Sequence, residues 1–217
     1  MTVLWLGALA CALVYWAQVL SPPDVLRSLA KTLSVALLAL IALLMGEAGL
    51  AAALALCALG DALLSRPGER AFALGVAAFA AGHIAFVSLF LTQPGADLQR
   101  LTNAPHIFAI IGLFALGAVM ARRILPAAGH LRVPVALYIP IILSMSLAAL
   151  SLPPSPATGL ILLGAALFLL SDSLLAVETF LLDNSQPLAR TLARTVWPSY
   201  WIAQALFLAG FTGIPVG

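Results

Sequence analysis

The chain has 217 residues, of which 63% are hydrophobic and only 8% carry a charge. Soluble domains carry about 25% charged residues, so this composition excludes an ordinary soluble protein and indicates an integral membrane protein. The formal net charge of +2 gives no reason to expect a nucleic-acid partner.

Apolar runs follow one another along the whole chain. A helix needs about 20 apolar residues to span a bilayer, within a range of about 17–25. On that scale the sequence predicts an all-α, polytopic membrane bundle of eight transmembrane helices, at residues 3–20, 27–45, 48–65, 70–91, 105–122, 133–150, 157–179 and 192–212. The connections are short, so we expect neighbouring helices to be antiparallel within one integral membrane domain, residues 1–217.

Some features of these runs have a purely structural interpretation. No basic residues precede the first run, which favours a membrane helix over a cleaved signal peptide. The two cysteines lie inside apolar runs and are interpreted as small buried side chains. Small residues allow close helix packing, so the fourth run is predicted to pack through a stripe of alanines at Ala73, Ala77, Ala81 and Ala85.

The basic residues gather at alternate connections. Only Arg100 lies on the other side, while nine flank the first, third, fifth and seventh connections: Arg27, Lys31, Arg66, Arg70, Arg122, Arg123, Arg132, Arg190 and Arg194. Positively charged connections tend to face the cytoplasm, which predicts that both termini lie on the non-cytoplasmic side. We expect a multi-pass protein of a bacterial inner (plasma) membrane.

Two aspartates lie inside hydrophobic runs, in similar surroundings. One belongs to Gly60-Asp61-Ala62-Leu63-Leu64 and the other to Ser171-Asp172-Ser173-Leu174-Leu175. A carboxylate in the membrane costs roughly 2.5–3.5 kcal/mol on insertion scales, so such residues usually serve a function. Both are predicted in the cytoplasmic half of the bilayer, with Asp172 the deeper of the two.

Few other polar residues lie in the predicted spans. Lys31 opens the second span, His83 lies near the middle of the fourth, and Tyr200 and Gln204 share a face of the eighth because they are four residues apart. Each also has a structural interpretation. Lys31 can extend to the interface, and the others can hydrogen-bond between helices.

The histidines do not predict a metal centre. His106 and His130 are separated by a whole span, about 30 Å, so they cannot join His83 in a three-histidine zinc site. A site made of Asp61, Asp172 and His83 is unusual for zinc. We therefore expect no metal and no cofactor.

A pair of buried acids favours hydrolysis started by proton transfer. Desolvation favours the protonated carboxyl and a nearby cation favours the ionised one, so two aspartates can act as acid and base. The alternatives are a small proton-coupled transporter or a non-enzymatic lipid-sensing bundle in which the aspartates hold helices together. Transport predicts polar residues on a path to both faces, and the predicted outer half has no intramembrane charge.

Over nearly its whole length the chain resembles the YhhN family of membrane proteins. The resemblance is carried by Lys31, Gly60-Asp61 with Leu63-Leu64, Phe72 with Gly75, Phe79 with Gly82-His83, Ser171-Asp172-Ser173, and Tyr200 with Ala203-Gln204. Thr32 departs from it, since the family often has proline there. The resemblance implies a lysoplasmalogenase, an ether hydrolase of lipid metabolism. Such an enzyme cleaves the vinyl ether bond of a lysoplasmalogen to a fatty aldehyde and glycerophosphoethanolamine or glycerophosphocholine.

The resemblance also implies a set of site residues. Asp61 and Asp172 are the catalytic pair, and our hypothesis makes Asp172 the protonated acid and Asp61 the ionised partner, with the reverse assignment open. The substrate is a lysophospholipid that arrives from the surrounding membrane lipids. The residues expected to position it are Lys31, which would meet the phosphate, with His83, Ser171, Ser173, Tyr200 and Gln204.

Overall fold

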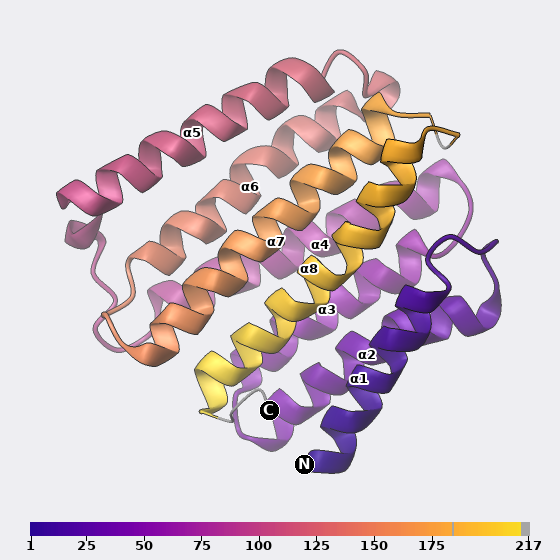
Figure 1. Cartoon of the computed structure of the whole chain (residues 1–217). Helices are drawn as coiled ribbons and strands as arrows, with labels where there is room; N and C mark the ends of the chain where they lie inside the picture. Colours follow the sequence, from indigo (N-terminus) through magenta and orange to yellow (C-terminus); the bar gives the residue numbers. More distant parts are fainter. Residues whose placement is uncertain (184, 214–217) are drawn as a thin grey trace.

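The computed structural model describes residues 1–183 and 185–213, and this part of the chain is helical throughout its regular structure (Figure 1). Its eight α-helices are α1 (Thr2–Ala17), α2 (Val25–Leu44), α3 (Ala48–Leu64), α4 (Glu69–Leu91), α5 (Ala104–Ile124), α6 (Arg132–Leu150), α7 (Pro156–Leu181) and α8 (Pro187–Thr212). Short 3-10 helices, Leu98–Thr102 and Gly129–Leu131, precede α5 and α6.

Each of the eight predicted runs is a helix in the structure. The largest difference lies in α8, which begins at Pro187 and not at residue 192. Proline suits the first position of a helix, because its backbone angle is already helical and its missing N–H would have had no partner there. The arginines that follow made this segment too polar to be recognised as part of a membrane helix from its hydrophobicity alone.

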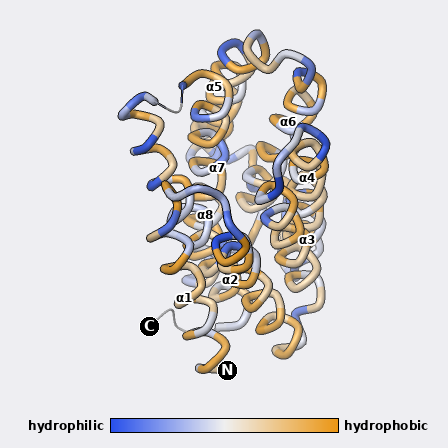
Figure 2. Tube along the Cα trace, turned by 90° about the vertical axis from the view of Figure 1, so that its right-hand side faces the viewer, coloured by the Kyte–Doolittle hydropathy of each residue, from blue (hydrophilic) through white to orange (hydrophobic). Residues whose placement is uncertain are grey.

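Seven of these helices form a closed ring, and α5 lies outside it. The order around the ring is α1, α2, α3, α4, α6, α7 and α8, with α8 returning to α1. Helix α8 also contacts α2 and α3, so it leans toward the centre. Helix α5 packs only on the outside, against α6 and α7, and Figures 1 and 2 show it at the edge of the bundle.

The two ends of the bundle differ in charge. Successive helices alternate in direction, so α1 begins and α8 ends at the same end (Figure 1). The other end holds the connections that follow α1, α3, α5 and α7, with the arginines that flank them, and we call it the basic end. In Figure 2 the hydrophilic stretches lie mostly at connections, whereas the helices are largely hydrophobic.

Five of the helices are long and apolar enough to cross a membrane: α2, α4, α5, α6 with its preceding turn, and α7. Helices α1 and α3 are apolar but shorter, with 16 and 17 residues. Helix α8 is longer and less apolar, since it includes Arg190 and Arg194. Leucines and phenylalanines are exposed along the outer faces, as expected where lipid is the solvent. The chain is therefore a multi-pass membrane protein.

Glycines set the packing between α3 and α4, and the predicted alanine stripe is wrong. Ala77 is exposed, and Ala73, Ala81 and Ala85 are only partly buried. A Cβ at Gly60 would lie 2.5 Å from the ring of Phe79, and one at Gly82 would lie 2.9 Å from the sulfur of Cys57. The buried face of α4 therefore consists of Gly75, Ala78, Phe79, Gly82, His83, Phe86 and Phe90.

Four phenylalanine side chains fill the space between the helices in the half of the bundle away from the basic end. They are completely buried, and the Phe86 and Phe207 rings lie 4.5 Å apart. We call Phe86, Phe90, Phe168 and Phe207 the aromatic plug. The main cavity therefore lies in the other half of the bundle, at the basic end.

Candidate active site

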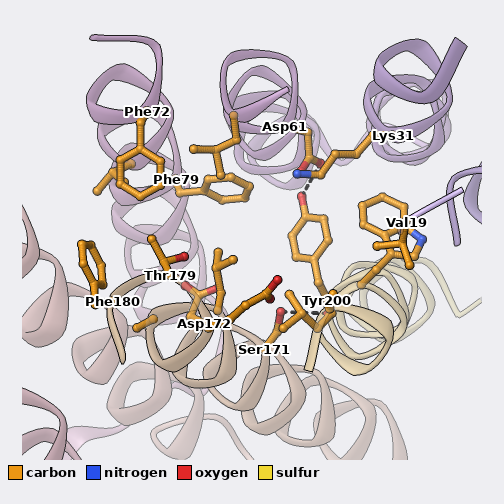
Figure 3. Close-up of a pocket in the computed structure, with 18 of the residues that line it drawn as sticks. Val19, Lys31, Asp61, Phe72, Phe79, Ser171, Asp172, Thr179, Phe180 and Tyr200 are labelled. Carbon is orange, nitrogen blue, oxygen red and sulfur yellow. Dashed lines mark hydrogen bonds and ion pairs between the residues drawn. The ribbon is translucent and has the colours of Figure 1, made fainter. Parts of the chain in front are cut away.

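The helices of the ring line a partly open cavity of about 310 Å³ in the basic-end half of the bundle (Figure 3). Asp61 from α3 and Asp172 from α7 both line it, with Tyr200 of α8 between them in the view of Figure 3. Helices α1, α2, α4 and α6 contribute further walls. Two carboxyl groups far apart in the sequence thus line one cavity.

Asp61 is held by a cation and a hydroxyl group. Its side chain is 1% exposed, and its Oδ1 lies 3.2 Å from the Nζ of Lys31. The hydroxyl of Tyr200 donates a hydrogen bond to Oδ2 at 2.8 Å. Lys31 also lies over the ring of Tyr15, with Nζ 5.7 Å from the ring centre. A cation and a donor together favour the ionised form of a carboxyl group.

A proline in α8, two residues before Tyr200, interrupts the helical hydrogen bonds at the place where α8 is tied to α1. Pro198 has no N–H, so the carbonyl group of Arg194 one turn earlier loses its usual helical partner. The indole N–H of Trp16 donates to that carbonyl at 3.0 Å, and the indole of Trp197 donates to the carbonyl of Ala12, also at 3.0 Å. These bonds tie α8 to α1 next to Tyr200 and satisfy the interrupted backbone.

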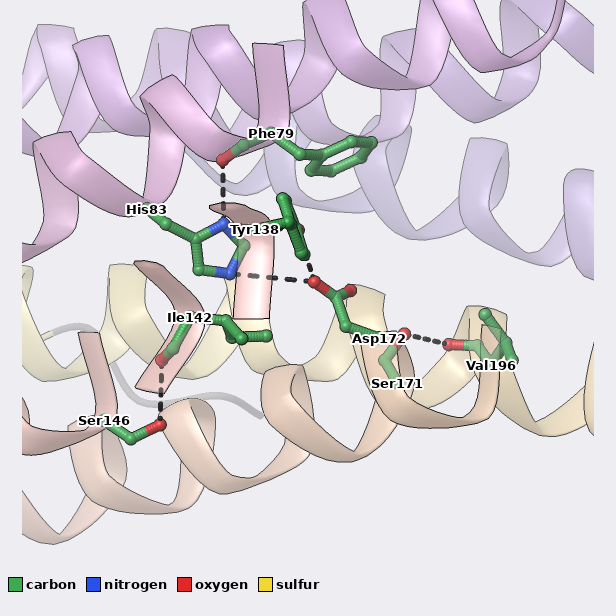
Figure 4. A network of polar contacts seen from close by, with 8 residues as sticks. All are labelled: Phe79, His83, Tyr138, Ile142, Ser146, Ser171, Asp172 and Val196. Atoms are coloured by element: carbon green, nitrogen blue, oxygen red, sulfur yellow. Dashed lines mark hydrogen bonds and ion pairs between the residues drawn. The ribbon is translucent and has the colours of Figure 1, made fainter. Parts of the chain in front are cut away.

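Asp172 has different partners. The hydroxyl of Tyr138 donates to its Oδ2, and the Nε2 of His83 lies 3.8 Å from the same oxygen (Figure 4). The Nδ1 of His83 lies 2.7 Å from the carbonyl oxygen of Phe79. Because that oxygen only accepts, Nδ1 carries the hydrogen, and Nε2 of the neutral ring turns a lone pair toward Asp172.

No lysine or arginine in residues 1–183 and 185–213 forms an ion pair with Asp172. The carboxyl group is 13% exposed toward the cavity. The ring of Phe168 packs against His83, with 4.4 Å between the two ring centres. Among the described residues Asp172 therefore has a phenol donor but no cation, so its ionised form is less well supported than that of Asp61.

The structure brings together only some of the predicted positioning residues. Lys31, Tyr200 and Ser171 line the cavity, and the Ser171 hydroxyl donates to the carbonyl of Val196 at 3.0 Å. His83 lies behind Asp172 and reaches the cavity only through it. Three of the six predicted residues therefore meet the cavity directly, and a fourth acts on it through an aspartate.

Ser173 and Gln204 do not line this cavity. Gln204 is completely buried one turn beyond Tyr200, next to the thiol of Cys57. Ser173 faces a second, smaller cavity of about 50 Å³ between α5, α6 and α7. That apolar cavity also touches Asp172 and Tyr138, so the side chain of Asp172 lies between the two cavities.

Sequence reasoning missed Tyr138. The sequence did contain a signal for it: the chain has only three tyrosines, and all of them lie in apolar runs. Tyr15, Tyr138 and Tyr200 all line the main cavity. Buried phenols usually find a hydrogen-bond partner, so tyrosines in such runs indicate where buried polar groups meet.

The described residues show no metal-binding cluster. Within them, no group of three or more His, Cys, Asp or Glu side chains is placed to hold a metal ion. At Asp61 the ammonium group of Lys31 already occupies one side of the carboxylate. The arrangement is that of two acids supported by phenols, a lysine and an imidazole.

Comparison with known proteins gives matches over most of the chain. A sequence model of the family described as YhhN matches residues 26–211. Two curated relatives, each named lysoplasmalogenase, come from Mycobacterium bovis and Mycobacterium tuberculosis. Each is 32% identical over 163 residues, which cover 73% of this chain and 58% of the relative. The alignment thus spans little more than half of either relative. No solved structure matches the chain.

Proposed function

This chain belongs to the YhhN family, and from that premise we propose that it is an intramembrane lysoplasmalogenase. It would cleave the vinyl ether bond of alkenyl glycerophosphoethanolamine or glycerophosphocholine to a fatty aldehyde and the glycerophospho-base. The names of the two relatives support a function of this type. The observation that carries the mechanism is that Asp61 and Asp172 line one cavity and each accept a hydrogen bond from a tyrosine, while only Asp61 is paired with a lysine in the described chain.

In this proposal Asp172 is the general acid. Its surroundings lack a lysine or arginine partner in the described chain and favour a neutral carboxyl group. Asp172 transfers its proton to the β-carbon of the vinyl ether, where the carbon–carbon double bond supplies the electron pair for the new C–H bond. The carbon attached to oxygen becomes part of an oxocarbenium ion. Proton transfer by a positioned side chain typically contributes about 10²–10⁴-fold to a rate.

Asp61 is then the ionised partner. Lys31 and Tyr200 support its negative charge, which stabilises the oxocarbenium ion across the cavity. Water adds to the cationic carbon and gives up a proton to a carboxylate of the pair. The resulting hemiacetal collapses to an aldehyde and an alcohol, with proton transfers that restore both aspartates. No covalent enzyme intermediate is required.

The second cavity, of about 50 Å³, gives room for the first part of the hydrocarbon chain of the substrate. It is lined mainly by apolar side chains of α5, α6 and α7, and it touches the face of Asp172 turned away from the main cavity. A vinyl ether held at Asp172 continues directly into its alkenyl chain. The alkenyl chain of the substrate would therefore leave between α5 and the ring of helices, toward lipid.

The proposed function implies a particular arrangement of the protein in the membrane. All eight helices cross the bilayer as one integral domain, with both termini on the non-cytoplasmic side and the basic end in the cytoplasm. The cavity would then lie in the inner leaflet, at the depth where a single-chain lipid places its ether bond.

Transport is the competing function. A transporter needs a route between both faces, but in the described residues the aromatic plug fills the ring beyond the cavity. The buried hydroxyl groups of Ser146 and Ser151, toward the opposite end, bond to their own helix or its end. A cavity with two acids that is blocked by the aromatic plug on one side favours catalysis on a substrate that enters and leaves from the other side.

The test is aldehyde release from an alkenyl lysophosphoethanolamine by purified protein in detergent. We expect Asp61→Asn and Asp172→Asn each to lower the rate by about 10²–10⁴-fold, and the saturated ether analogue to be left intact. Asp97→Asn is the matched control, because Asp97 lies exposed in the connection after α4. Folded variants with full activity would reject the carboxylate mechanism, and wild-type protein that releases no aldehyde would reject the function.

A further inference from the structure

Charged side chains of both signs line the outer part of the cavity. Arg27 and Lys31 of α2 and Glu178 of α7 all contribute to its wall. Glu178 is half-buried and makes no hydrogen bond or ion pair within the described part of the chain, although the charge of Lys31 acts on it. A carboxylate left without a close partner in a lined cavity is available to a ligand.

These charges lie between the acids and the basic end. Glu178 follows Asp172 by six residues, which places it about 9 Å farther along α7 toward that end. Arg27 precedes Lys31 by one turn of α2, about 6 Å in the same direction. With its ether bond at the aspartates and its chain in the apolar cavity, a lysolipid must extend its headgroup past these two side chains.

Arg27 retains donors for a phosphate. Its Nη1 donates to the carbonyl of Ser21 at 2.7 Å, and its guanidinium lies over the ring of Tyr15, 5.5 Å from the ring centre. A guanidinium has five N–H donors, so most of them stay available. Lys31 is less suited to this role, because its ammonium group already pairs with Asp61 at 3.2 Å.

We propose that the outer part of the cavity is a binding site for a zwitterionic headgroup, in which Glu178 binds the ammonium group and Arg27 binds the phosphate. This inference rests on the proposed function and names the substrate class that the site selects. With an ethanolamine headgroup both contacts are charge-assisted hydrogen bonds, which are about twice as strong as neutral ones, whereas choline would meet Glu178 through charge alone. Lysolipids that end in an ammonium group are therefore favoured over those that end in the phosphate alone.

The experiment compares two substrates with the same alkenyl chain, one with a phosphoethanolamine headgroup and one with a bare phosphate monoester. Aldehyde release is measured for wild type, Glu178→Gln, Arg27→Gln and the control Glu69→Gln. Glu69 is exposed at the same end of the bundle, paired with His130, and does not line the cavity. Thermal unfolding in detergent shows which variants are folded.

We expect Glu178→Gln to raise KM for the ethanolamine lipid about tenfold, with kcat unchanged and KM for the phosphate lipid unchanged or lower. Arg27→Gln raises KM for both lipids, and Glu69→Gln changes neither. Equal kinetics of folded Glu178→Gln and wild type on both lipids would overturn the headgroup site while the proposed function stands. Wild-type protein that cleaves neither lipid would overturn both.

Discussion

The two aspartates are alike in sequence but differ in their surroundings. Each follows a small residue and precedes a small residue and two leucines. Asp61 meets a lysine and a phenol, whereas Asp172 meets a phenol and an imidazole whose lone pair faces it. The partners come from α2, α4, α6 and α8, so the local pattern positions a carboxyl group and distant helices decide its chemistry. This difference separates the acid from the base in the proposed reaction.

The largest effect on stability should come from removing the cation at Asp61. Loss of one partner from a buried ion pair typically costs about 3–5 kcal/mol. Lys31 is 15% exposed, so we expect Lys31→Met to lower the free energy of unfolding by about 2–3 kcal/mol. Asp172→Asn should cost less than about 1 kcal/mol, because an amide replaces a neutral carboxyl group with little loss of hydrogen bonding.

Thermal unfolding in detergent measures both changes. The double variant Lys31→Met/Asp61→Asn should recover most of the stability that Lys31→Met loses, since it leaves no unpaired charge. A large loss for Asp172→Asn and a small one for Lys31→Met would reverse the assignment of acid and base.

Removing the tyrosine hydroxyl at each aspartate tests the same difference between Asp61 and Asp172, with smaller expected changes in stability. A hydrogen bond to a charged group contributes about 1.5–3 kcal/mol, and one between neutral groups about 1 kcal/mol. Tyr200→Phe should therefore destabilise the protein more than Tyr138→Phe, because only Tyr200 bonds the aspartate that is paired with a lysine. Equal unfolding midpoints for the two variants would mean that the aspartates carry the same charge.

The last prediction concerns how closely α3 approaches α4 beside Asp61. A Cβ at Gly60 would lie 2.5 Å from the Phe79 ring, and overpacking of this kind costs about 1–3 kcal/mol. We expect Gly60→Ala at the lower end of that range, with a reduced rate of aldehyde release because Asp61 moves with its helix. Gly112→Ala on α5 is the control, since a Cβ added there would have no atom within 4 Å. Its unfolding midpoint and rate should match wild type.

Much of the fold was predictable from hydrophobicity, because helices in lipid must satisfy their own backbone hydrogen bonds. The positions of all eight helices follow from that rule, and the cost of burying a carboxylate singled out the two aspartates that line the cavity. Tyr200, which was predicted to position the substrate, lines the cavity. The sequence suggested that Lys31 or Arg27 could keep one aspartate charged, but it could not predict that Lys31 pairs with Asp61, because that contact depends on how two helices pack.

Other features were predicted wrongly or not at all, again because they depend on how the helices pack. The alanine stripe of α4 follows a valid spacing rule, but the deeper approach at Gly60 and Gly82 rotates the helix so that another face is buried. Ser173 shares its motif with Asp172, yet it points to a different cavity because neighbouring residues on a helix face different directions. Gln204 lies one turn below the cavity and packs beside Cys57.

The short length of α3 has a consequence for the lipid around it. At 1.5 Å per residue its 17 residues extend about 25 Å, less than the roughly 30 Å of an average hydrocarbon core. In the proposed arrangement the bilayer compensates by thinning locally on the α1–α3 side. Such a dimple would lower the phosphate layer toward Asp61 and shorten the distance a lysolipid must sink before its ether oxygen reaches the acids.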